Sequence, residues 1–75
     1  MLDDRQCQID FGLFIKEGRE KQHLYQSQVA DVLEISQQYY SKIENGVRNV
    51  DLALALKICE VLKLNMTDFV RTYIK

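Results

Sequence analysis

The stretch Gln26–Gly46, QSQVADVLEISQQYYSKIENG, decides how this chain folds. Within it, Val29, Ala30 and Leu33 recur at helical spacing, which predicts a short helix with one apolar face. After a brief interruption, Ser36 is a suitable N-cap for a second helix, because its hydroxyl can accept a backbone N–H from the following turn. The first half of the stretch therefore predicts a helix, a tight turn and the start of another helix.

The second predicted helix occupies residues 37–45 and has an apolar side and a polar side. Tyr40 and Ile43 face inward at helical spacing. The remaining polar residues are Gln37, Gln38, Ser41, Lys42 and Asn45. Residues 26–45 thus form a predicted helix-turn-helix with a glutamine-rich outer face.

This stretch resembles the helix-turn-helix family of phage Cro and CI repressors, also called the xenobiotic-response-element (XRE) family. The pattern of that family is Gln-x-x-Leu/Val-Ala-x-x-Leu/Val-Gly-Val/Ile-Ser, followed by a recognition helix that ends in Glu-x-Gly. Ten residues match it in fixed register: Gln26, Val29, Ala30, Leu33, Ile35, Ser36, Ser41, Ile43, Glu44 and Gly46. The resemblance implies an all-α, five-helix, lambda-repressor-like domain that binds double-stranded DNA.

Five positions depart from the family pattern, and one of them is Val50, where the family commonly has proline. His23 and Glu34 stand where the family usually has glycine, which takes a left-handed backbone conformation at low cost. Tyr25 replaces the usual serine or threonine N-cap, and Gly18 replaces an apolar residue within the first helix. We expect His23 and Glu34 to adopt positive φ, with a cost in stability rather than a change of fold.

Length and composition indicate one small helical domain. The chain has 75 residues, of which 47% are hydrophobic, with no proline and three glycines. Residues 1–8 show no periodicity and are predicted to be a flexible or loosely packed arm, and residues 9–75 are predicted to be the domain. A separate ligand-sensing domain is not expected. With no membrane-length apolar run and no signal-peptide pattern, we expect a cytoplasmic protein.

The first helix is predicted to begin near Asp10 and to end at about Gln22. Its inner face consists of Phe11, Phe14, Ile15 and Gly18. Leu13 lies off this apolar stripe, so it either contacts a partner chain or is simply exposed at the surface.

The residues that carry metal and catalytic chemistry are few. Cys7 and Cys59 are far apart and fall in no metal-ligand spacing, and His23 is the single histidine. Cys59 lies on the apolar face of a later helix, where a thiol behaves as a small hydrophobe. We therefore expect no metal, no cofactor and no small-molecule ligand. Because no nucleophile–base arrangement is evident, we expect no enzymatic activity.

Two more helices complete the predicted domain. Asp51 can cap a fourth helix that runs to about Leu62, and Asn65 can cap a fifth. Apolar residues cover roughly 220° of the fourth helix, more than the ~100° stripe of a surface helix. This helix is therefore either central to its own domain or in contact with a second subunit. The predicted homodimer interface consists of Leu54, Ile58, Phe69, Val70, Tyr73 and Ile74.

The outer face of the second helix of the motif carries the predicted base-reading residues: Gln37, Gln38, Ser41 and Lys42. An α-helix fits the major groove, where each base pair presents a distinct set of donors and acceptors. A glutamine amide can donate to and accept from adenine, and a lysine can donate to guanine. The alternative is a polar surface that serves only solubility.

Residues on either side of this helix are suited to phosphate contacts. Gln26 begins the first helix of the motif, where free backbone N–H groups favour an anion. Asn45 and Arg48 follow the recognition helix and are predicted to contact the flanking backbone. The resemblance also implies a salt bridge between Arg19 and Glu44, which would link the first helix to the recognition helix.

The charge distribution leaves two functions open. The formal net charge of −1 counts against a nucleic-acid partner, but residues 36–75 hold six bases against four acids. The first hypothesis is a dimeric regulator, in the simplest case a repressor, on an inverted-repeat operator. The second is an antitoxin-like or anti-repressor module that keeps the fold but binds a protein.

Overall fold

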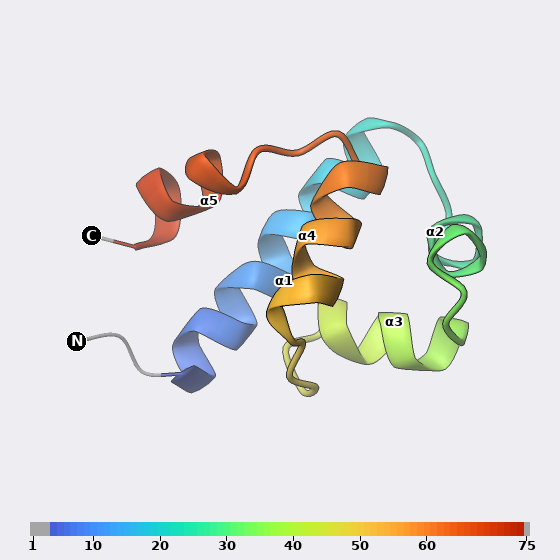
Figure 1. The fold of residues 1–75 in the computed structure, drawn as a ribbon, viewed down its shortest axis with the longest axis horizontal. Coiled ribbons are helices and arrows are strands. Elements are labelled where there is room, and N and C mark those ends of the chain that lie inside the picture. The colour runs from blue at the N-terminus through green and yellow to red at the C-terminus, as the bar shows by residue number, and fades with distance from the viewer. Residues whose placement is uncertain (1–3, 75) are drawn as a thin grey trace.

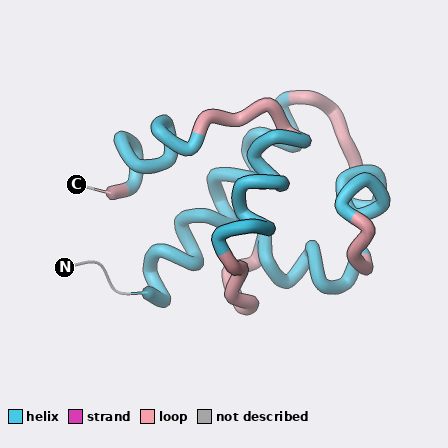
Figure 2. Tube along the Cα trace, in the orientation of Figure 1, coloured by secondary structure: helices cyan, strands magenta, loops and turns pink. Residues whose placement is uncertain are grey.

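A computed structural model describes residues 4–74 of the chain. In this part the chain is entirely helix and loop, as Figure 2 shows, and the predicted all-α fold with five helices is confirmed. The helices are α1 (Asp4–Lys21), α2 (Gln26–Leu33), α3 (Gln37–Glu44), α4 (Leu52–Val61) and α5 (Met66–Tyr73). Within residues 4–74, every helix falls short of the length and apolarity that a membrane span requires.

Helices α1 and α4 lie in the middle of the domain, with α2 and α3 on one side of them and α5 on the other (Figure 1). Helix α1 packs against α3 and α5, while α2 packs against α3 and α4. Figure 1 shows α3 with α2 at one end of the longest dimension, which spans 34 Å, and α5 at the other. The side chains that fill the centre are Phe11, Ile15, Val29, Ala30, Tyr40, Ile43, Ala55, Ile58, Cys59, Leu62 and Phe69.

Helix α1 begins earlier than predicted. The prediction of an arm over residues 1–8 is wrong for residues 4–8, which form the first turn and more of α1; residues 1–3 lie outside the described part. Cys7 packs against the core one turn before Phe11, and Gln8 Nε2 donates to the Gly46 carbonyl oxygen at 2.9 Å. These contacts with residues far along the chain stabilise a segment whose own periodicity is weak.

Helix starts follow the capping rules. Ser36 Oγ accepts from the Tyr39 N–H at 3.0 Å, and Asp51 Oδ1 accepts from the Leu54 N–H at 2.8 Å. Asn65 caps α5 in the same way. At α2 the side chain of Tyr25 does not cap; instead Gln28 Oε1 accepts from the backbone N–H of Tyr25 at 2.7 Å.

Three turns place residues other than glycine in the left-handed region. His23 and Glu34 adopt φ of 58° and 59°, which confirms the expectation for both. Lys63, at 56°, does the same after α4 and was not anticipated. Each of these three residues follows a helix, and at His23 and Glu34 the family pattern would use glycine, which adopts the left-handed conformation at lower cost.

Glycine is required where α1 crosses the end of α3. A Cβ on Gly12 would lie 2.7 Å from the Ile43 carbonyl oxygen and closer still to that of Glu44, so a side chain there would press on fixed backbone. At Gly18 the side chain of Leu64 fills the space instead, which explains the missing apolar residue at that position. The small residue at position 12 therefore sets how closely α1 approaches the recognition helix.

Two residues of the predicted dimer interface belong to the interior. Ile58 is fully buried and Phe69 is 4% exposed, so neither can meet a partner, and this part of the prediction is wrong. Ile58 lies in the central cluster, and Phe69 packs edge-on against Phe11 with ring centroids 5.5 Å apart. Part of the apolar face of α4 is covered by its own domain, as Ile58 shows. Another part is open to a second subunit, because Leu52 and Leu56 on the same helix are 72% and 50% exposed.

Candidate nucleic-acid interface

A shallow hollow of about 460 Å³ lies where the start of α2 meets the outer face of α3. Its lining consists of Gln26, Gln37, Gln38, Ser41 and Lys42. All four predicted base-reading residues and one predicted phosphate contact are therefore brought together on one surface. No hydrogen bond or ion pair within residues 4–74 engages the side chains of Gln37, Gln38 or Lys42.

The chemistry of this hollow is that of hydrogen bonding rather than apolar recognition. Three glutamine amides, a hydroxyl and an ammonium group supply donors, and the amides and hydroxyl also supply acceptors. Gln26 comes from the start of α2, and the other four residues come from the first turn of α3 and from the next turn on the same side. Such a surface on a short protruding helix is suited to the edges of base pairs in the major groove.

A buried ion pair holds α3 against α1. Arg19 Nε donates to Glu44 Oε2 at 2.6 Å, and its terminal nitrogen donates to Oε1 at 3.1 Å, in a two-point arrangement. Arg19 also donates to the Leu24 carbonyl oxygen at 2.7 Å. The Glu44 side chain has no exposed surface. The salt bridge that the resemblance implied is thus present and buried.

The surroundings shift the pKa of both partners. The hydrogen bond to Glu44 raises the pKa of Arg19. Burial alone would raise the pKa of Glu44, but the hydrogen bonds from Arg19 and Gln26 outweigh it, and the net pKa is lowered. Both groups are therefore held in their charged forms, and α3 is fixed to α1 by a complete ion pair.

Tyr40 supports the same end of α3 from inside. Its ring is fully buried, and its hydroxyl lies beside the Arg19–Glu44 ion pair. Burial and the neighbouring Glu44 carboxylate raise the pKa of this hydroxyl, which therefore stays neutral.

Gln26 connects the ion pair to the surface. Its Nε2 donates to Glu44 Oε1 at 3.0 Å, so its amide is oriented by α3, while the residue also lines the hollow. One amide hydrogen and the carbonyl oxygen are left for other partners. This link joins residues that are 18 positions apart, and no local pattern of the sequence indicates it.

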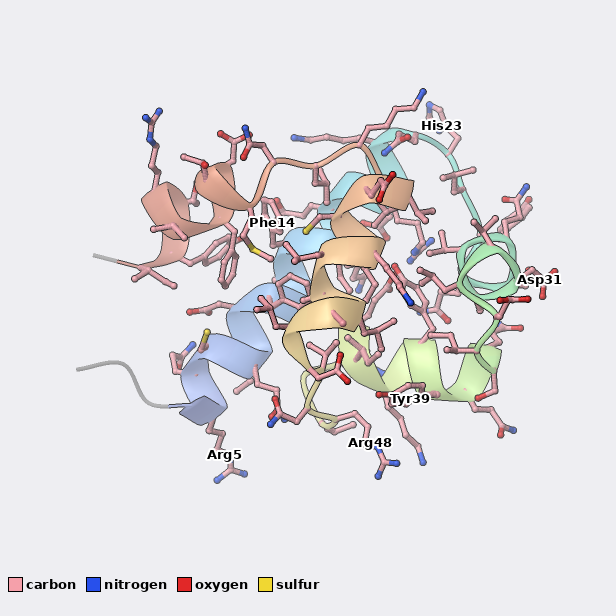
Figure 3. The ribbon with its side chains drawn as sticks, in the orientation of Figure 1. Arg5, Phe14, His23, Asp31, Tyr39 and Arg48 are labelled. Carbon is pink, nitrogen blue, oxygen red and sulfur yellow. The ribbon has the colours of Figure 1, made fainter. Side chains whose placement is uncertain are left out.

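The other predicted phosphate contacts lie at the far end of α3. Asn45 is the exposed C-cap residue of α3, and Arg48 follows in the loop. The guanidinium of Arg48 lies over the Tyr39 ring, 5.6 Å from its centroid. Figure 3 shows both residues at the same edge of the molecule, with Asp31 on α2 well away from them. Tyr39 thus packs within the domain as a support for Arg48.

Among residues 4–74, no group of three histidine, cysteine, aspartate or glutamate side chains is arranged to hold an ion. Both cysteines are free thiols, and burial raises the pKa of Cys59.

Comparison with models of protein families gives a match. A family model described as helix-turn-helix matches residues 15–69, which include the whole of α2, α3 and α4. A comparison with curated proteins gives no match.

Proposed function

Because the chain belongs to the Cro/CI-type helix-turn-helix family of DNA-binding regulators, we propose that it is a sequence-specific transcriptional repressor. In this proposal α3 enters the major groove of an operator and covers the promoter. Activation through contact with a polymerase is the less simple alternative for the same site. Such a protein acts on chromosomal DNA, in the cytoplasm.

The observation that carries the proposal is the hollow at the start of α3. Five residues that the sequence pattern predicts as DNA contacts line this one surface. Gln37 and Gln38 are exposed and are oriented by a helix whose opposite side is buried and ion-paired. A rigid helix with an unoccupied donor and acceptor surface is what base reading requires.

The proposed roles follow position along α3. Gln37 and Gln38 read bases at the N-terminal end, and Ser41 and Lys42 reach neighbouring base pairs one turn on. The phosphate contacts are made by Gln26, Asn45 and Arg48, which lie on either side of the reading residues and fix the register of the domain on DNA.

A homodimer on an inverted repeat completes the proposal. Of the predicted interface, Leu54, Val70, Tyr73 and Ile74 retain exposed surface, and Val70 is 44% exposed. A two-fold dimer would present two recognition helices to half-sites about one helical turn apart. We expect Val70→Asp to produce a monomer in sedimentation, with the helical content of wild type by circular dichroism. A footprint on a single asymmetric half-site would contradict the dimer.

The direct test is fluorescence anisotropy with DNA from upstream of the gene and with scrambled DNA, over a series of salt concentrations. Specific binding with a steep salt dependence supports the proposal, because phosphate neutralisation releases counterions. The double variant Gln37→Ala/Gln38→Ala should lose the preference for the upstream DNA while keeping the salt dependence. Binding that this double variant leaves unchanged would contradict the role of α3.

A protein-binding function is the second candidate. The observation that favours it is exposed apolar surface on two helices, with Val32 on α2 at 66% and Leu52 on α4 at 72%. In that case a pull-down should recover a partner, and Leu52→Asp should abolish capture while Gln37→Ala/Gln38→Ala should not.

A further inference from the structure

The loop that follows the recognition helix leaves α3 in a fixed direction. Gly46 takes a left-handed conformation, with φ of 75°, and the Val47 N–H donates to the Lys42 carbonyl oxygen at 3.1 Å. These are the features of a Schellman ending, in which a glycine after the helix turns the chain. Gln8 Nε2 on α1 also donates to the Gly46 carbonyl oxygen, at 2.9 Å. The backbone is therefore held in place just before it reaches Arg48.

The side chain of Arg48 extends from this point onto an aromatic ring. Its guanidinium carbon lies 5.6 Å from the centroid of the Tyr39 ring, within the range of a cation–π contact. Figure 3 shows the two residues at one edge of the molecule. Within residues 4–74, no hydrogen bond or ion pair engages the Arg48 side chain. The ring of Tyr39 is therefore what orients this guanidinium in the described part of the chain.

The acceptors that follow Arg48 in the loop are used elsewhere. Asp51 Oδ1 caps α4 by accepting from the Leu54 N–H at 2.8 Å. Asn49 Oδ1 accepts from the Val50 N–H at 3.1 Å. A carboxylate on the guanidinium would compete with a phosphate for the same donors. A ring does not compete, because the N–H donors of a guanidinium lie in its plane and a ring stacks on its face.

Tyr39 is itself held firmly on one flank of α3. Its half-buried ring packs against the hydrophobic core, and the Ser36 hydroxyl accepts from its backbone N–H at 3.0 Å. Glu44, which accepts the hydrogen bond from Gln26, lies about 140° around the helix from Tyr39. The ring therefore holds Arg48 on the flank of α3 away from Gln26, so that the two predicted phosphate contacts lie on opposite flanks of the reading residues.

We propose that Tyr39 is a positioning residue for DNA binding, which holds the Arg48 guanidinium in place for a phosphate beside α3. This inference deepens the proposed function and rests on it, because it presupposes that α3 binds DNA. A long side chain loses rotamer freedom when a ligand fixes it. A guanidinium already held on a ring loses less, so the complex is tighter. Because a phosphate contact reads no sequence, the gain is the same on upstream and scrambled DNA.

The test is a double-variant cycle, measured by anisotropy with fluorescein-labelled upstream and scrambled DNA. Tyr39→Leu should weaken binding of both duplexes about two- to fivefold per bound subunit, as expected for an exposed cation–π contact. It should keep the wild-type salt slope, because the charge remains. Arg48→Ala should make that slope shallower by about 0.9 per subunit. In the Arg48→Ala background, Tyr39→Leu should have no further effect, and Tyr39→Phe, which keeps the ring, should retain the wild-type affinity.

The matched control pairs Tyr39→Leu with Arg71→Ala, which removes the same charge from an exposed position on α5, at the other end of the molecule. Tyr39→Leu should weaken binding as much in this background as in wild type. If Tyr39→Leu weakens binding equally with and without Arg48, the ring acts on DNA directly or through the fold, and the inference is overturned. An unchanged affinity in Tyr39→Leu, or an equal loss in Tyr39→Phe, would overturn it as well.

A measurement on the free protein separates the orientation of Arg48 from the stability of the fold. The ring current of Tyr39 should shift the Arg48 Nε–Hε signal in nitrogen-15 spectra of wild type and of Tyr39→Phe. In Tyr39→Leu the signal should return to the position of a solvated arginine, with the helical content of wild type by circular dichroism. A signal that Tyr39→Leu does not move would show that the ring does not hold Arg48.

The same variants separate this inference from the proposed function. If Gln37→Ala/Gln38→Ala abolishes the preference for upstream DNA and Tyr39→Leu leaves the affinity unchanged, only the role of Tyr39 is refuted. If wild-type protein shows no salt-dependent binding to either duplex, the proposed function fails, and the role of Tyr39 in DNA binding fails with it.

Discussion

The two sides of α3 have opposite relations to the rest of the molecule. The inner side, with Tyr40, Ile43 and Glu44, is at most 3% exposed and is fixed by packing and by the ion pair with Arg19. The outer side, with Gln37, Gln38 and Lys42, is exposed and engages no other described residue through a hydrogen bond or ion pair. One short helix thus has a buried side that fixes its position in the domain and an exposed side that is available to a binding partner.

This difference indicates how stability and recognition are divided within eight residues. A change on the inner side should affect folding, because it leaves a cavity, a clash or an unpaired charge in the interior. A change on the outer side should leave folding nearly unaffected, because water already solvates those groups. It should affect binding instead. Variants on the two sides, and at the α1 contact that supports the inner side, test this division.

The largest effect is expected from breaking the buried ion pair. Arg19→Ala should cost about 3–5 kcal/mol in the free energy of unfolding, because Glu44 is left buried and without its cationic partner. Thermal and urea melts of Arg19→Ala, Glu44→Ala and the double variant would measure the coupling between the two residues. Lys16→Ala, on the exposed side of α1, is the control. Additive losses in the double variant would mean that the two charges are not coupled.

The next largest effect is expected at the crossing of α1 and α3. Gly12→Ala should destabilise the fold by about 1–3 kcal/mol, since the added methyl group meets the backbone oxygens of Ile43 and Glu44. Gly18→Ala is the matched control, because its methyl group meets only the side chain of Leu64, which can rotate away. Equal midpoints for the two variants in thermal melts would show that α1 can withdraw from α3 at little cost.

Acid should weaken the inner side in a way that depends on Glu44. The pKa of Glu44 is lowered from its ordinary value of 4.5 in the folded protein, so its ionisation stabilises the fold above that value. This contribution is lost as the pH falls through the lowered pKa. Glu44→Gln should be less stable at neutral pH and should show a flatter fall in stability below pH 4.5 than wild type. A parallel acid profile for the two proteins would assign the fall to other carboxylates.

The smallest effect on stability is expected on the outer side. Gln37→Ala/Gln38→Ala should change the free energy of unfolding by less than about 0.5 kcal/mol, because both side chains are exposed. The same variant should lose about 1–3 kcal/mol of base discrimination for each bidentate contact removed. A large drop in the thermal midpoint would show that the outer side also supports the fold, and the contrast between the two sides would then be lost.

Much of the fold could be predicted because helices are local. The spacing of Val29, Ala30 and Leu33 indicated α2, and Ser36 and Asp51 indicated where α3 and α4 begin. Positive φ at His23 and Glu34 followed from the positions that they occupy between helices. In each case the decisive interaction lies within about one turn of the residue concerned, so the neighbouring sequence contains it.

Other features could not be predicted because the interactions behind them are long-range. The start of α1 depends on Gln8 and Gly46, which are 38 positions apart, and the orientation of Gln26 depends on Glu44. Periodicity also identified Ile58 and Phe69 as apolar without showing that their own domain covers them. The candidate site followed the same division. Helical spacing indicated which polar residues share the outer side of α3, but it did not indicate the link from Gln26 to the ion pair or the position of Arg48 over Tyr39.

The sequence by itself determined the helix-turn-helix, the family pattern and the polar residues on the outer side of α3, because helical spacing and capping act over a few residues. Tertiary structure alone decided which apolar residues remain exposed, how closely α1 approaches α3, and that Gln8 holds the early turns of α1 against the loop at Gly46. These properties depend on contacts between segments far apart in the chain, and such contacts are settled only when the whole interior packs.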